Sequence, residues 1–468
     1  MVALIASVVL LVWGLITHGT FAGSGDEPHY LVIAHSVAFD GDLDLSNNYR
    51  EATLVADGAL LPESHAIEVD GKLRPVHDVG MPVVLAPIVR VAYAAANSLG
   101  DALPPALLDR ARLNKGLLLR HQLSLLMALL TGFLAREVYL LIRSLGGSAR
   151  AAFGWALLCA LTPPVLSHSF LFFTEIPTAL LATFVFRKLS LRDIHTGSVS
   201  LLVGVITGFL LILHARNIGL VAGLVVIAVL MARQRLFERR LLPMFLIGVT
   251  AGVIGRTLVT YILWDSFIQT PHAALRTALP LSLIGREVFV RATGLLFDRE
   301  YGLLAYAPIY CLAVAGLTAL SRNASTVYRN MAIAVGCYLL PILLPVTNHH
   351  GWSGGWSPAA RFLLPVVPLL WLPVYAFWTH GVGAGKAVAT VLVALQIAIN
   401  AYAWQFPKTL WSDGDGVAAA PFTRWLPTWF AGDATLIFAV ALAVLAAFVV
   451  LGRALTVTVP RAGDVLAS

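Results

Sequence analysis

Three acidic residues stand where a carboxylate could act as a general base or bind a cation. Asp26 and Glu27 follow the first apolar segment, directly ahead of Pro28. Glu175 lies between two further apolar segments, where a carboxylate is costly unless it is paired or faces a polar cavity. Such a carboxylate can take a proton from a hydroxyl group or help to hold a divalent metal. The alternative is local, because Asp26 would also cap the helix that Pro28 begins.

Cationic residues near other apolar segments are candidates for binding phosphate. Lys72 and Arg74 precede His77 and Asp78, just ahead of an apolar segment with two prolines. Cations at such a place can bind a phosphate whose lipid tail lies in the bilayer, or they form an ordinary basic rim over lipid head groups. Arg216 lies in a polar break between two apolar segments, where it would meet a phosphate or a carboxylate.

A third group combines cations, aromatic residues and glycines. Arg299 and Tyr301 lead into one apolar segment. A glycine-rich turn leads into another and contains His349, His350, Trp352, Trp356 and Arg361. Tryptophan faces suit sugar rings, glycine permits close backbone approach, and arginine suits phosphate. The two adjacent histidines lack the i,i+4 spacing of metal ligands on one helix face, so a metal is the weaker interpretation there.

The chain that positions these residues has a composition that excludes a soluble globular protein. Of its 468 residues, 58% are hydrophobic and only 12% are charged, against roughly 25% charged in soluble domains. A lipid-facing surface explains how so many apolar side chains can point outward. The net charge of +7 comes from cations in short loops between apolar segments, which is typical of membrane topology. We expect contacts with membrane lipids and no nucleic-acid partner.

We therefore expect an all-α, polytopic bundle of about twelve transmembrane helices, formed by residues 1–468 as a single integral membrane domain. The expected spans are 2–18, 122–142, 151–172, 176–190, 199–214, 217–232, 241–262, 302–320, 330–347, 363–380, 386–404 and 432–452. If all basic loops lie on the cytoplasmic side, the direction of successive spans alternates consistently only when the apolar segment 79–97 does not cross the membrane. That segment is interpreted as a re-entrant or interface-lying helix.

This topology places three long segments on the outer face, at 19–121, 263–301 and 405–431. The first carries the acidic motif on short amphipathic and juxtamembrane helices, including an expected helix at 28–39 with one apolar face. The composition favours a multi-pass protein of a prokaryotic plasma membrane with its active site on the outer face.

Taken together, the motifs resemble the GT-C superfamily of membrane glycosyltransferases, particularly the branch of protein O-mannosyltransferases and the lipid A aminoarabinose transferase. In that family an acidic motif follows the first span, as Asp26 and Glu27 do here. An acidic residue before a proline matches Glu175, and a tryptophan/glycine turn ends at Arg361. The family's short helix opens with consecutive prolines, whereas this chain has only Pro82 in the matching motif.

The resemblance implies a GT-C-like fold, a polyprenyl-phosphate sugar donor and a hydroxyl-bearing glycan, lipid or protein acceptor. Asp26 would deprotonate the acceptor during an inverting transfer, and Glu27 and Glu175 would orient the substrates. A divalent metal is a possible cofactor, and Asp26 and Glu175 would hold it if one is used. The candidate substrate-binding residues are Tyr30, Lys72, Arg74, His77, Asp78, Arg216, Arg299, Tyr301, His349, His350, Trp352, Trp356 and Arg361.

Two other functions remain open at this point. A transporter or flippase of a lipid-linked sugar would place charges near the middle of its spans. Arg256, within the expected span 241–262, fits that alternative. A polymerase or ligase of the same superfamily would use a diphosphate-linked donor instead. Most polar motifs cluster on the expected outer face, which favours surface chemistry over transport.

Overall fold

The described part of the chain is mostly helical, which confirms the all-α class. The computed structural model describes residues 1–18, 25–51, 65–111, 115–267, 280–320, 325–344, 351–355, 357–411, 420–432 and 434–454. In these residues the sheet structure is one antiparallel hairpin, formed by β1 (Ala66–Val69) and β2 (Lys72–Pro75). The GT-C-like arrangement of the helices stays a prediction.

Seven helices in the described residues are long and apolar enough to cross a membrane. They are α4 (Gly80–Ala102), α6 (Lys115–Ser144), α11 (Ile218–Arg233), α12 (Leu242–Trp264), α17 (Thr326–Leu343), α19 (Gly383–Gln405) and α20 (Ala434–Ala454). Shorter apolar helices are α1 (Val2–His18), α7 (Ala149–Ala160), α10 (Gly197–Leu213) and α16 (Cys311–Leu320). The count of about twelve crossings stays a prediction.

Several expected spans are divided into shorter helices. The span 151–172 ends early as α7, and after a turn containing Pro163 and Pro164 the chain forms only the short α8 (Val165–His168). The span 302–320 is α15 (Leu303–Tyr306), a 3₁₀ turn from Pro308 and α16. The physical reason is that proline lacks the backbone N–H that a continuing helix needs. The expected spans 176–190 and 363–380 correspond to α9 (Glu175–Ser190) and α18 (Val367–His380).

The segment 79–97 forms one continuous helix. Pro82 stands in the first turn of α4 and Pro87 lies inside it, yet the helix runs unbroken to Ala102. This rules out a re-entrant turn within the segment, because such a turn would interrupt the helix. An unexpected helix, α14 (Leu281–Phe297), occupies much of the expected loop 263–301.

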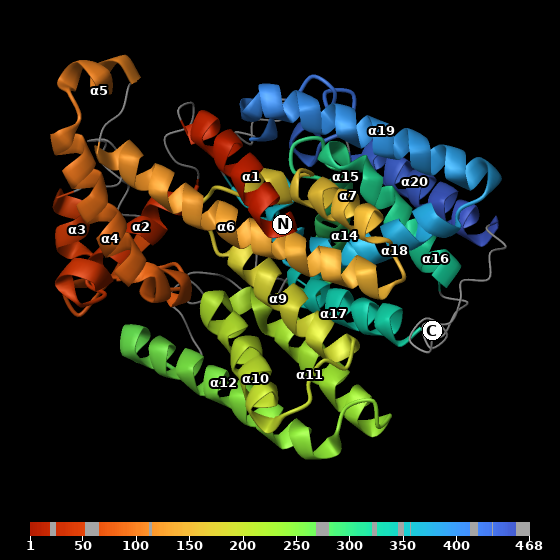
Figure 1. The fold of residues 1–468 in the computed structure, drawn as a ribbon, viewed down its shortest axis with the longest axis horizontal. Helices are drawn as coiled ribbons and strands as arrows, with labels where there is room; N and C mark the ends of the chain where they lie inside the picture. Colours follow the sequence, from red (N-terminus) through yellow and green to blue (C-terminus); the bar gives the residue numbers. More distant parts are fainter. Residues whose placement is uncertain are drawn as a thin grey trace.

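In the first expected outer segment, α2 packs against α3 and α4. Figure 1 shows α2 (Glu27–His35), α3 (Ser46–Glu51), α4 and α5 (Pro105–Ala111) at the left, with α18–α20 at the opposite side. The expected single apolar face of α2 is wrong, because Tyr30 to Ala34 are all buried. Five consecutive apolar side chains point in all directions around the helix axis, so they do not form one face. Helix α4 packs against one side of α2.

Helices α10 and α12 lie side by side at van der Waals contact because glycines line their interface (Figure 1). Gly204 and Gly208 on α10 face Gly248 and Gly252 on α12, in the small-xxx-small spacing of close helix pairs. A Cβ atom on Gly252 would lie 2.3 Å from the carbonyl carbon of Gly208. The pair therefore cannot accept a side chain at this crossing without moving apart.

We expect Gly252→Ala to lower the free energy of unfolding by about 1–3 kcal/mol, because overpacking forces the backbones apart. Gly336→Ala is the matched control, since a Cβ atom there meets no other atom within 4 Å. Denaturant titration in mixed micelles measures both. Equal stability of the two variants would contradict the close α10–α12 contact.

Candidate active site

Three of the sequence motifs meet at one buried guanidinium group. Nη2 of Arg361 donates to Oδ2 of Asp26 at 2.6 Å, and Nε of Arg361 donates to Oε1 of Glu175 at 2.7 Å. Nη2 of Arg216 donates to the same Glu175 oxygen at 2.8 Å. Two carboxylates and two guanidinium groups therefore form a charge-balanced network. The four residues come from four separate parts of the chain.

Asp26 stands at the N-cap position of α2, but its side chain makes no capping hydrogen bond. The expectation that it caps this helix is therefore wrong. Burial on its own would raise the pKa of Asp26, but the charge and the hydrogen bond of Arg361 outweigh that effect. They hold the pKa well below its usual range, so the carboxylate is ionised at neutral pH. Its position at a helix N-terminus favours the same charge.

Glu175 is the first residue of α9 and is fully enclosed, with 1% of its side chain exposed. The N-terminus of a helix stabilises a negative charge, and two guanidinium groups reach the same oxygen. The sequence made a buried carboxylate without a partner improbable. Glu175 is accordingly paired, with two guanidinium groups.

The turn that presents Arg361 depends on two glycines. Gly354 and Gly355 have φ angles of +88° and +65°, in the left-handed region that glycine adopts at low cost. The backbone N–H of Ala360 then donates to the carbonyl of Tyr301 at 3.0 Å, directly before Arg361. The Arg361 guanidinium lies 4.5 Å from the centre of the Phe173 ring, which adds a cation–π contact.

Arg216 is positioned by a second charged cluster around Asp78. Asp78 Oδ2 accepts from the backbone N–H of Ala215 at 2.9 Å and lies 3.3 Å from Nδ1 of His214. Asp78 Oδ1 pairs with Arg256 from the middle of α12. Asp78 therefore fixes the short turn that carries Arg216, and it neutralises Arg256. No contact in the described residues assigns Asp78 to substrate binding.

Two histidines that the sequence analysis did not select lie beside this network. The hairpin turn at Asp70 and Gly71, with φ angles of 52° and 73°, brings His65 next to His77. Nδ1 of His65 lies 2.9 Å from Nε2 of His77. The His29 ring stacks on His65 at 3.7 Å between centroids. An Asp-Gly pair is a strong hairpin signal, and it could have predicted this contact.

Glu27 and Tyr30 hold the site together from α2. Oε1 of Glu27 accepts the backbone N–H of Phe172 at 2.9 Å, which ties α2 to the segment before Glu175. Tyr30 is buried, with its ring 5.2 Å from that of His77. These contacts give both side chains a positioning role.

Within the described residues, no hydrogen bond or ion pair joins Lys72, Arg74 or Trp352 to the Arg361 network. Lys72 is exposed on β2, and Arg74 on the same strand makes no ion pair within the described residues. Tyr301 and Trp352 are buried against each other, with ring centroids 6.1 Å apart, so Trp352 packs in the interior. Arg299 is half-buried beside them, and its backbone N–H donates to the carbonyl of Pro427. His349, His350 and Trp356 lie outside the described residues.

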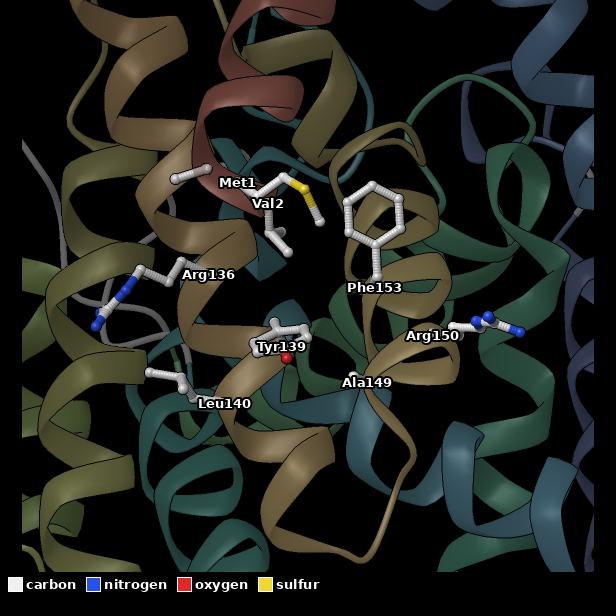
Figure 2. Close-up of a pocket in the computed structure, with 9 residues that line it drawn as sticks. Met1, Val2, Arg136, Tyr139, Leu140, Ala149, Arg150 and Phe153 are labelled. Carbon is white, nitrogen blue, oxygen red and sulfur yellow. The ribbon is translucent and has the colours of Figure 1, made fainter.

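A cavity of about 450 Å³ lies at the start of α1, the end of that helix farther from Asp26. Figure 2 shows Phe153 and Tyr139 facing this cavity, with Arg136 and Arg150 pointing away from its centre. None of the predicted site residues lines it. The cavity is therefore separate from the Arg361 network.

A divalent metal between Asp26 and Glu175 does not fit this arrangement. The guanidinium of Arg361 stands between the two carboxylates and donates to both. A cation there would face that positive charge at hydrogen-bond distance.

Comparison with protein-family models gives no matching family, and comparison with curated proteins gives no matching protein.

We expect Arg361→Gln to lower the free energy of unfolding by about 3–5 kcal/mol, because it removes the guanidinium partner of Asp26 and leaves the buried Glu175 with Arg216 alone. Arg240→Gln is the control, since Arg240 pairs with Glu238 on the surface with 80% of its side chain exposed. That change should cost less than about 1 kcal/mol. Equal losses in a denaturant titration would contradict the buried network.

Proposed function

We propose that the chain is a multi-pass membrane glycosyltransferase of the GT-C type. It transfers a sugar from a polyprenyl-phosphate donor to a hydroxyl group, with inversion, on the outer face of a prokaryotic plasma membrane. The observation that carries this proposal is the contact of Arg361 with both Asp26 and Glu175. It joins three of the four motifs on which the resemblance rests.

The proposed reaction is a single displacement. The acceptor oxygen forms a bond to the anomeric carbon while its proton passes to the Asp26 carboxylate. The bond from the anomeric carbon to the phosphate oxygen breaks, and the polyprenyl phosphate leaves with that electron pair. Guanidinium groups near the leaving phosphate stabilise its charge, which is the largest requirement of such a transfer.

The charge-balanced network suggests how donor binding prepares the base. A donor phosphate competes with the carboxylates for the guanidinium groups, and it reaches Arg216 first. The side chain of Arg216 is 15% exposed, whereas that of Arg361 is only 4% exposed. Each hydrogen bond that moves from carboxylate to phosphate raises the pKa of the carboxylate. Asp26 becomes a stronger base when the phosphate also takes the hydrogen bond of Arg361, because Arg361 is the guanidinium partner of Asp26 and Arg216 pairs with Glu175.

The transport alternative is not favoured by the surroundings of Arg256. In sequence this arginine resembled a charge in the middle of a transport path. Its guanidinium pairs with Asp78, which precedes α4 by two residues. The charge is thus neutralised by a fixed carboxylate and helps to position Arg216.

The experiment is a transfer assay with purified protein in lipid. Donors are radiolabelled sugars on polyprenyl monophosphate and diphosphate, and a membrane-lipid extract supplies acceptors. We expect the monophosphate donor to give product and Asp26→Asn to reduce the rate by about a hundredfold or more, since general-base catalysis contributes that much. Asp101→Asn is the matched control, because Asp101 is exposed and its ion pair with Lys115 lies at the surface.

Each outcome has a distinct meaning. Full activity of Asp26→Asn would contradict the base role and keep the transferase. Product from diphosphate donors alone would assign a polymerase or ligase. Movement of intact donor across the bilayer without product would contradict the transferase and favour a transporter.

A further inference from the structure

Side chains of three residues converge in a way that the proposed transfer does not require. One ligand atom from each of Asp26, His65 and His77 lies within 4.8 Å of the other two. Nδ1 of His65 is 2.9 Å from Nε2 of His77, and that Nε2 is 4.0 Å from Oδ1 of Asp26. Ligand atoms of a tetrahedral zinc site lie about 3.3 Å apart, given bonds of about 2.0 Å. Shifts of less than about 1 Å would bring these atoms to a common metal.

The two carboxylate oxygens of Asp26 face different partners. Oδ2 accepts from Arg361, whereas Oδ1 faces His77. One oxygen can therefore bind a cation while the other keeps its hydrogen bond to the guanidinium. This separates the histidine cluster from the Asp26–Glu175 pair, where Arg361 leaves no room for a cation.

A third histidine holds the ring of His65 in place. The stacked ring of His29, whose Nδ1 lies 2.8 Å from the hydroxyl of Tyr49, restricts the rotation of His65.

We propose that Asp26, His65 and His77 bind one divalent transition metal of the zinc type. When the metal binds, the proton between the two imidazole nitrogens moves to the other nitrogen of its own ring, and the freed lone pair binds the metal. Three protein ligands leave the fourth tetrahedral position open for water or another small oxygen ligand. The site is a property of α2 and the hairpin, and it holds whether or not the protein transfers sugars.

The test uses full-length protein purified with a tag that contains no histidine and stripped of metal by a chelator. Co²⁺ is then added, and its visible absorption is recorded. We expect one Co²⁺ per chain with the intense absorption of tetrahedral coordination. His65→Gln and His77→Gln should each weaken binding by at least about a hundredfold, because even the loss of an outer hydrogen-bond partner costs 10–100-fold.

Two further variants exclude a general loss of structure. His195→Gln changes an exposed histidine far from the cluster in sequence and should leave binding unchanged. His65→Cys should restore binding and add the charge-transfer absorption of a thiolate ligand. Absence of stoichiometric Co²⁺ binding to the wild type, or unchanged binding in His65→Gln, would overturn the proposal. Because the readout is spectroscopic, failure of the sugar-transfer assay does not affect it.

Discussion

The burial of Arg361 is the constraint on which the site depends. A guanidinium group removed from water costs several kcal/mol unless opposite charges and hydrogen bonds replace its hydration. Burial would lower the pKa of Arg361, but Asp26 and Glu175 outweigh it and raise that pKa. The folded chain must therefore bring the start of α2, the start of α9 and the glycine turn to one point. Displacing the glycine turn leaves Asp26 without its guanidinium partner, and displacing either helix start removes one of the two carboxylates of Arg361.

The contacts of Asp78 link the Arg361 site to the α10–α12 pair. Asp78 holds Arg256 of α12 and the backbone after α10, and that backbone carries Arg216 to Glu175. The glycine contacts between α10 and α12 thus set the position of a residue in the site. Since both clusters pair carboxylates with guanidinium groups, little net charge remains buried.

Asp26 lies where two kinds of ligand would meet. A phosphate drawn to Arg361 would raise the pKa of Asp26, whereas a metal bound with His65 and His77 would lower it. The two proposed ligands therefore act on Asp26 in opposite directions. With both present, the proton affinity of this carboxylate would reflect their balance, because its two oxygens face the two partners separately.

The sequence by itself determined the helical class, the apolar composition and the special status of Asp26, Glu175 and Arg361. The helical class follows from the long apolar segments. The three charged residues stand out because a charge beside apolar residues requires a partner wherever it lies. Only the tertiary structure decided which partner each charge has. Local rules offered helix capping as an alternative role for Asp26, and they missed His65 because its neighbour His77 is brought close by a hairpin. They also joined helices that prolines divide at residues 163 and 308. Contacts between distant segments depend on how whole helices pack, and residue types and spacing alone do not contain that information.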